Sequence, residues 1–417
     1  MAKAALVGAV VVFLPLVLAA WPPERPSGDR PTPEQLAWQD AEFGMFCHFG
    51  TNTFTDREWG DGKASPDVFN PTEFDPRQWV AAAKAAGMKY LVVTAKHHDG
   101  FCLWPTRQTD YCVRSSKWRD GKGDVIREVA DACHAAGIKL GIYLSPWDRH
   151  EPRYADNKAY DQYYMAQMTE LLTNYGEVFE FWADGAGGKG HQYDWAAYYR
   201  HLKKLQPHCL WVIAGVPDVR WVGNEDGLAP ETLWNVTRVG DREYWLPAEC
   251  DARIRAHWFW HPNDANTLKS VEELVAMYHA SVGRGANLLL NVAPDNRGLL
   301  PESDVARLKE LRAALDAIYA HDLLAGQRAS ASSEASGHGA AAALDGRLDT
   351  YWLASASNQE PWLAVDCGGP VTLDRVVAQE AIQLGQHIRR YALDAWDGKA
   401  WQRVVEGTTI GHKKTDI

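Results

Sequence analysis

Short apolar segments alternate with segments of helical periodicity from about residue 38 onward. Apolar runs of strand length lie at 43–50, 89–98, 139–146, 177–185, 209–215 and 286–294, with one more after residue 245. Stretches with helical spacing lie at 76–87, 123–137, 160–175, 195–205, 270–281 and 301–319. Because continuous apolar strands need cover on both faces, the alternation predicts a parallel sheet surrounded by helices.

The number of these units favours a (β/α)8-type TIM barrel over an open doubly wound sheet. Seven or eight strand–helix units fit between residue 38 and about residue 320, which suits the eight units that close such a barrel. The sequence also lacks the glycine-rich dinucleotide motif after its first strand. We therefore expect residues 38–322 to be an α/β barrel that carries the catalytic site.

The two ends of the chain differ from this middle part. Residues 1–20 combine Lys3, an apolar run and two small residues, the pattern of a secretory signal peptide. An uncleaved membrane anchor is the alternative, since the run is nearly long enough to span a bilayer. Residues 21–37 are rich in proline and predict a linker. Residues 323–417 alternate apolar and polar positions between turn residues and predict an all-β module.

Composition narrows the functional classes. The chain has 417 residues and a net charge of −11, so it lacks the basic surface that a nucleic-acid partner requires. No GxSxG, Walker or HExxH motif is present, which removes the main support for serine hydrolases, P-loop NTPases and metalloproteases. The 19 tryptophans could fill a core or line a cleft that stacks on sugars. With the leader removed, we expect a secreted or extracytoplasmic protein without a membrane segment.

Two carboxylates are the first candidates for chemistry. Asp184 ends an apolar strand, and Glu225 follows the next strand by way of a loop, 41 residues further on. Carboxylates from different strand ends at the active face of a barrel suit glycoside hydrolysis, in which one assists at the anomeric carbon and the other protonates the leaving oxygen. Asp226 is an alternative to Glu225, and Asp184 could instead be a turn-forming residue before Gly185.

Histidines at strand ends have two interpretations. His48, His97, His98 and Asp99 could bind a metal ion, but adjacent histidines project in opposite directions from a strand. We therefore do not expect a metal site here. In the second interpretation, neutral histidines bind substrate hydroxyls.

Four further residues complete the predicted pocket. Glu58 would also bind hydroxyls, Arg255 would supply a charged clamp, and Trp59 and Trp258 would supply aromatic walls.

Seven ordered motifs between about residues 38 and 320 resemble the α-L-fucosidases of glycoside hydrolase family 29, most closely the branch that acts on α-1,3/1,4-linked fucose. They are MFCHFGTNTFTDREWGDGKASPDVFNPTEFDPRQWV, TAKHHDGFCLWPT, YLSPWDRHE, FEFWADGAGG, WVGNEDG, PAECDARIRAHWFW and SVGRGANLLLNVAPDNRG.

This resemblance implies specific roles. Asp184 would be the nucleophile of a retaining double displacement, and Glu225 the general acid and then base, roles that need opposite protonation states. The substrate would be a fucosylated oligosaccharide or glycoconjugate, and the family implies neither a metal nor a cofactor. The fucose-binding positions would be His48, Glu58, Trp59, His97, His98, Tyr143, Trp182, Arg255 and Trp258.

The C-terminal segment resembles a discoidin, or F5/8-type, jelly-roll module. It is shorter than such β-sandwich modules usually are, so we expect a partial module at 323–417 that either binds sugar or serves as a structural appendage. Two other functions compete with the hydrolase. One is a lectin-like barrel that binds fucose or galactose without cleaving it, and the other is a metal-dependent barrel hydrolase.

Overall fold

The computed structural model describes residues 21–22, 25–188 and 190–417. The leader expected at 1–20 lies outside the described residues. None of the helices in the described part of the chain is long and apolar enough to cross a membrane.

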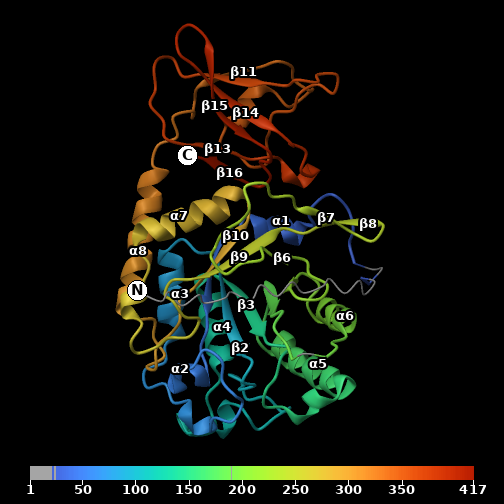
Figure 1. The fold of residues 1–417 in the computed structure, drawn as a ribbon, viewed down its shortest axis with the longest axis vertical. Helices are drawn as coiled ribbons and strands as arrows, with labels where there is room; N and C mark the ends of the chain where they lie inside the picture. The colour runs from blue at the N-terminus through green and yellow to red at the C-terminus, as the bar shows by residue number, and fades with distance from the viewer. Residues whose placement is uncertain (1–20, 23–24, 189) are drawn as a thin grey trace, which may run out of the picture.

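Eight parallel strands form a nearly closed barrel, which confirms the predicted fold class (Figure 1). Their hydrogen-bonded order is β5-β4-β3-β2-β1-β10-β9-β6, and a parallel bridge between Val212 and Val219 connects β5 to the segment that enters β6. The strands are β1 (Phe43–Cys47), β2 (Tyr90–Lys96), β3 (Lys139–Leu144), β4 (Glu180–Ala183), β5 (Leu210–Ile213), β6 (Arg220–Trp221), β9 (Ala248–Arg253) and β10 (Asn287–Asn291).

Helices surround this barrel where the periodicity predicts them. Four of them, α3 to α6, each begin after an aspartate whose side chain accepts a backbone N–H of the first turn, and α7 begins with a capping box. Such caps satisfy otherwise unpaired N–H groups. The helices are α1 (Pro33–Gln39), α2 (Thr51–Thr55), α3 (Pro76–Ala85), α4 (Val125–Ala136), α5 (Asn157–Asn174), α6 (Trp195–Leu205), α7 (Val271–Ser281) and α8 (Glu302–Ile318).

The eighth strand is the element that periodicity does not detect. β6 has two residues, Arg220 and Trp221, which is too short for an apolar pattern. No helix lies between β5 and β6, and the hairpin β7 (Val236–Val239) and β8 (Arg242–Trp245) takes the place of a helix before β9. The chain therefore departs from the regular strand–helix repeat on the side of the barrel that carries Glu225.

Strand alternation divides the core into two layers. Along β1, Met45 and Cys47 pack outward with the helices, whereas Phe46 points into the barrel with Tyr90, Tyr143 and Trp182. Large aromatic side chains thus fill the barrel interior. The seven cysteines are all unpaired, and six of them are buried.

The described part of the segment 21–37, which we expected to be a linker, packs on the barrel. Arg25 is buried between the rings of Trp21 and Tyr244 and lies 3.9 Å from a carboxylate oxygen of Asp218. Helix α1 begins within the same segment. A cation that stacks on aromatic rings and faces a carboxylate holds this segment in place, a tertiary contact that its proline-rich composition does not reveal.

Small antiparallel sheets follow the barrel and form a separate module beyond α7 and α8 (Figure 1). They pair β11 (Arg328–Ala331) with β12 (Leu363–Asp366), β13 (Val376–Ala378) with β16 (Lys414–Asp416), and β14 (Tyr391–Trp396) with β15 (Trp401–Gly407).

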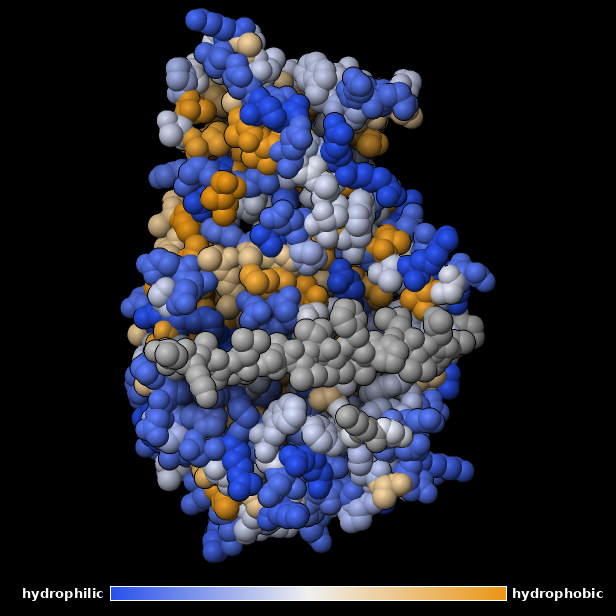
Figure 2. Space-filling model, in the orientation of Figure 1, coloured by the Kyte–Doolittle hydropathy of each residue, from blue (hydrophilic) through white to orange (hydrophobic). Residues whose placement is uncertain are grey.

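The module exposes large apolar side chains, and Figure 2 shows apolar surface gathered on it. Trp362, Trp396 and Trp401 are each more than half exposed, whereas Ala340 and Ile382 are its buried apolar residues. Its contact with the barrel includes two hydrogen bonds of the Gln386 amide, whose oxygen accepts from the Asn235 side chain and whose NH2 group donates to the carbonyl of Leu233. These three tryptophans therefore contribute little to a core.

Candidate active site

The residues expected from the sequence lie at or beyond the carboxyl ends of barrel strands. His48 follows β1, the histidine pair follows β2, Tyr143 belongs to β3, and Trp182 belongs to β4. The remaining positions lie in loops: Glu58 and Trp59 after α2, Asp184 after β4, Glu225 after β6, and Arg255 and Trp258 after β9. A shared strand direction brings these distant positions to one face.

Asp184 is a partly exposed carboxylate held by two donors. Its Oδ2 accepts the Tyr143 hydroxyl at 2.9 Å, and its Oδ1 accepts the backbone N–H of Ala186 at 2.7 Å. Burial raises the pKa of Tyr143 well above its ordinary value, so the phenol remains a donor. The side chain of Asp184 is 24% exposed, and Nε2 of His98 lies 3.7 Å from Oδ2. The carboxylate is thus oriented while still open to a ligand.

Burial keeps the three pocket histidines neutral. It lowers the pKa of His48 to about 3, lowers that of His97 well below 6.5, and lowers that of His98 as well, although Asp184 opposes the last shift. A neutral imidazole has one donor and one acceptor nitrogen, and the partner of one nitrogen determines the role of the other.

The partners assign those roles. His48 Nδ1 donates to Oδ1 of Asn291 at 2.8 Å. Because the Ser145 hydroxyl donates to a carbonyl, His98 Nδ1 donates to Ser145 Oγ at 2.7 Å. The Asn52 amide lies 3.4 Å from His97 Nδ1 and can donate to it. The pocket therefore offers Nε2 acceptors from His48 and His98 and an Nε2–H donor from His97, a set that suits hydroxyl groups.

Glu225 contacts the indole of Trp258, which also packs against His48. Its Oε2 accepts the Trp258 indole N–H at 3.3 Å and lies 3.8 Å from a guanidinium nitrogen of Arg253. The centre of the Trp258 ring lies 4.9 Å from that of the His48 ring, and the guanidinium carbon of Arg253 lies over the Trp258 ring at 5.2 Å. Asp226 is exposed as well, but none of its described hydrogen bonds or ion pairs reaches this pocket. The contacts favour Glu225 of the two neighbours.

Glu58 positions the loop that carries Trp258. Its carboxylate accepts the backbone N–H groups of Trp258 at 2.6 Å and Phe259 at 3.2 Å. Asn291 supports the same loop by donating to the carbonyl of Trp258 at 2.8 Å. Trp59 is 56% exposed and meets the rings of His98 and Trp147 edge to face. It forms an accessible aromatic rim.

The pocket floor rests on a buried pair of carboxyl groups. The Trp182 ring stacks on Tyr143, and its indole N–H donates to Glu249 at 2.8 Å. Tyr90 donates to the other oxygen of Glu249, and Trp38 donates to Glu180 at 2.6 Å. Burial raises the pKa of both glutamates, and the charge of Glu180 raises that of Glu249 further.

This pair predicts that the protein loses stability as pH rises. Near neutral pH the two buried glutamates keep their protons in the folded protein, whereas an unfolded glutamate, with an ordinary pKa near 4.5, has already released its proton. The free energy of unfolding should therefore fall as pH rises toward the folded-state pKa of Glu180, about 8, and denaturant titrations between about pH 6.5 and about pH 8 should show it. Glu180→Gln, which needs no proton, should flatten this dependence. An unchanged slope in Glu180→Gln would contradict the prediction. The buried histidines have the opposite effect on the free energy of unfolding. Their pKa values are lowered, so they destabilise the folded protein as pH falls below 6.5.

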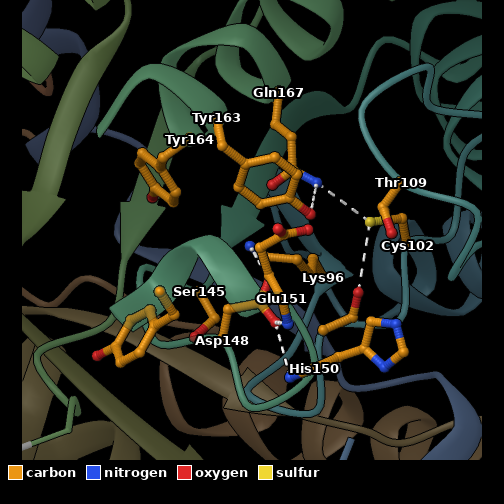
Figure 3. Close-up of polar contacts among 12 residues, drawn as sticks. Lys96, Cys102, Thr109, Ser145, Asp148, His150, Glu151, Tyr163, Tyr164 and Gln167 are labelled. Carbon is orange, nitrogen blue, oxygen red and sulfur yellow. Dashed lines mark hydrogen bonds and ion pairs between the residues drawn. The ribbon is translucent and has the colours of Figure 1, made fainter. Parts of the chain in front are cut away.

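A buried ion pair fixes the loop behind the histidines (Figure 3). Lys96 Nζ lies 2.9 Å from Oδ2 of Asp148, and the two side chains are 0% and 1% exposed. Asp148 Oδ1 accepts the backbone N–H groups of His150 and Glu151. The rings of Tyr160, Tyr163 and Tyr164 of α5 surround the ammonium group at 5.3 to 5.6 Å. Lys96 directly precedes His97, so this cluster connects the end of β2 to the loop that carries Ser145.

Removing the ammonium group of Lys96 should destabilise the folded protein. Lys96→Met leaves the Asp148 carboxylate buried without its partner, and we expect it to lower the free energy of unfolding by about 3–5 kcal/mol. Lys96→Met/Asp148→Asn should recover part of this loss because it removes the second charge. Scanning calorimetry measures the effect. The control is Asp131→Asn, which removes an exposed ion pair with Arg127 and should change stability by less than about 1 kcal/mol. Equal melting temperatures for Lys96→Met and the control would refute the prediction.

Arg253, which the sequence analysis did not single out, lies where a charged clamp was expected from Arg255. Arg255 is buried and bonds to Asp264 at 2.6 Å and Asp304 at 2.7 Å, which ties the loop after β9 to the start of α8. Arg253 is the guanidinium beside Glu225. Sequence reasoning missed Arg253 and Asn291, although Asn291 could have been found as a polar residue at the end of an apolar strand.

The arrangement offers two carboxylates from different strands, neutral hydroxyl-binding imidazoles and aromatic walls. The carboxylates can act on an acetal carbon and its leaving oxygen, and a small ligand with several hydroxyl groups fits the remaining set.

Comparison with known proteins gives consistent matches. Residues 22–317 match the family model described as Alpha-L-fucosidase, and residues 328–416 match the F5/8 type C domain model. The chain is 42% identical to "Alpha-L-fucosidase 1" of Arabidopsis thaliana over 411 residues, covering 92% of this chain and 81% of the relative.

Solved structures agree. The structure of SpGH29 has a TM-score of 0.89 and 36% identity and covers 94% of this chain and 92% of its own. A Ruminococcus gnavus GH29 fucosidase in complex with fucose has a TM-score of 0.86 and 33% identity, covering 93% of this chain and 89% of its own.

Proposed function

The chain belongs to the α-L-fucosidase family, glycoside hydrolase family 29, and from this premise we propose that it is an exported enzyme that removes terminal α-1,3- or α-1,4-linked L-fucose with retention of configuration. Asp184 is the nucleophile and Glu225 the acid and base. The observation that carries these roles is the contact pattern of the two carboxylates: Asp184 is oriented by Tyr143 and Ala186, and Glu225 faces Trp258 and Arg253.

In the first step, a carboxylate oxygen of Asp184 attacks C1 of the fucose ring from the face opposite the leaving group. The C1–O bond to the aglycone breaks, and Glu225 gives its proton to the departing oxygen. The products are a fucosyl ester on Asp184 and the free aglycone alcohol. The Tyr143 O–H and the Ala186 N–H keep the attacking carboxylate oriented.

In the second step, the ionised Glu225 takes a proton from water as the water oxygen attacks C1. The ester bond to Asp184 breaks, and fucose leaves with its original configuration. Arg253, 3.8 Å from Glu225, stabilises the carboxylate form that this step requires. This assigns to Arg253 the electrostatic role that the sequence assigned to Arg255.

The remaining pocket residues bind the sugar. The neutral imidazoles of His48, His97 and His98 accept from and donate to its hydroxyl groups, as their partners require. Trp182 and Trp258 supply apolar surface for the ring face and for the methyl group that distinguishes a 6-deoxy sugar. Glu58 acts on the sugar through the loop of Trp258.

A panel of fucosylated oligosaccharides tests this function. With α-1,2-, α-1,3-, α-1,4- and α-1,6-linked substrates, we expect fucose release from the α-1,3 and α-1,4 linkages. Release mainly from the α-1,2 or α-1,6 linkage would overturn the specificity but retain the activity. Binding of these glycans without any release would favour the lectin-like alternative. Export is tested separately by determining the N-terminal residue of the protein recovered outside the cell.

A further inference from the structure

Three side chains at the pocket mouth form a group with the composition of a metal site. Glu58, His257 and His261 each place one ligand atom within 4.8 Å of the others. Glu58 Oε1 lies 3.3 Å from His257 Nδ1, and the rings of His257 and His261 lie 4.4 Å apart. Two imidazoles and one carboxylate are a ligand set that zinc binds, with a fourth position left open.

His261 carries the features of a supported ligand. Its Nδ1 lies 2.5 Å from Oδ1 of Asp56, and its Nε2 is buried without a hydrogen-bond partner among the described residues. Metal-binding histidines usually have a carboxylate on the nitrogen that does not bind the ion. An unpaired buried nitrogen is otherwise unfavourable, so a ligand at this position would satisfy it.

The spacing is close to that of a bound ion. Ligand atoms at zinc–ligand bonds of about 2.0–2.2 Å in tetrahedral geometry lie roughly 3.3–3.6 Å from one another. The Glu58–His257 distance of 3.3 Å already meets this value. The distances from the His261 ligand atom to those of Glu58 and His257 are at most 4.8 Å. They would have to shorten by little more than 1 Å, which is roughly what a side-chain movement in a half-buried loop achieves.

The same glutamate supports the catalytic pocket. Glu58 accepts the backbone N–H groups of Trp258 and Phe259, and the Trp258 indole contacts Glu225. An ion on Glu58 would compete with these N–H groups for the carboxylate oxygens. Occupation of the site would therefore change the position of Trp258 beside Glu225.

We propose that Glu58, His257 and His261, with Asp56 behind His261, bind a divalent ion of the zinc type, and that the bound ion inhibits the enzyme by releasing the Trp258 loop. The proposal that the ion binds depends only on the geometry of these side chains. The proposal that the ion inhibits the enzyme also rests on the proposed function of the pocket. Asp184 and Glu225 are not among the ligands, and neither step of the proposed reaction requires the ion.

Calorimetric titration with zinc chloride tests whether the ion binds. We expect one equivalent to bind to the wild-type protein, at least about 10-fold weaker binding in His261→Gln and His257→Gln, and roughly 10–100-fold weaker binding in Asp56→Asn. His208→Gln is the matched control, because His208 is an exposed histidine that also pairs with a carboxylate, Glu34, and its affinity should equal the wild-type value. Unchanged affinity in both site variants, or no binding up to about 1 mM zinc, would overturn the proposal.

Inhibition is measured with an aryl α-L-fucoside at increasing zinc concentration. The inhibitory concentration should follow the calorimetric affinity in the wild type and rise at least about 10-fold in His261→Gln, whose activity without zinc should be retained. Zinc that binds at this site without inhibiting would overturn the coupling through Trp258. Inactivity of the wild type toward every fucoside would refute the proposed function but leave the binding result intact.

Discussion

Asp184→Ala should lower the turnover of an aryl α-L-fucoside by on the order of 10,000-fold, equivalent to a barrier about 5 kcal/mol higher. The physical reason is the loss of the only group proposed to form a bond with C1. Asp184 is also the carboxylate that the Tyr143 hydroxyl and the Ala186 N–H orient. Single-turnover and steady-state release of the aryl alcohol measure the effect.

Added azide distinguishes a missing nucleophile from a damaged pocket. In Asp184→Ala, azide can enter the vacated space and attack C1 from the same face, so activity should partly return with β-fucosyl azide as the product. Asp241→Ala is a suitable control, since Asp241 is an exposed residue in the turn between β7 and β8 and should leave turnover unchanged. Near-normal turnover by Asp184→Ala without azide would exclude Asp184 as the nucleophile.

Glu225→Gln should produce a loss that depends on the leaving group. A natural oligosaccharide needs protonation of its leaving oxygen, so its hydrolysis should fall by roughly 100- to 10,000-fold. The aryl oxide of an activated aryl fucoside leaves without being protonated, so the first step should change little. The second step still needs Glu225 as a base, so the fucosyl-enzyme should accumulate. Rates with a series of aryl fucosides of increasing leaving-group pKa measure this dependence.

Asp226→Asn is the matched control for Glu225→Gln. Asp226 is the exposed neighbour in the same loop, and its described hydrogen bonds and ion pairs do not reach the pocket. Its replacement should leave the leaving-group dependence as in the wild type. Azide should rescue Glu225→Gln to α-fucosyl azide, the opposite configuration to the product of the Asp184 variant. Equal losses on all leaving groups in Glu225→Gln, with a selective loss in Asp226→Asn, would transfer the acid role to Asp226.

Periodicity predicted seven of the eight barrel strands and the six helices that surround them. Continuous apolar strands and helices with one apolar face are required wherever a parallel sheet is buried on both sides. The sequence did not predict β6, because two residues carry no periodic pattern. It also did not predict that the segment around Arg25 packs on the barrel, because that contact depends on Trp21 and Tyr244, more than 200 residues apart.

The sequence by itself determined the fold class, the family and the two candidate carboxylates, because strand and helix periodicity and ordered motifs are local properties of the chain. Only the tertiary structure decided which residues meet. It placed Arg253 rather than Arg255 beside Glu225, and it brought Asn291 to both His48 and Trp258. It also brought Glu58 to His257 and His261, from distant loops. Adjacent positions face different ways at a strand end, and contacts between loops depend on how the barrel closes, so neither can be read from spacing alone.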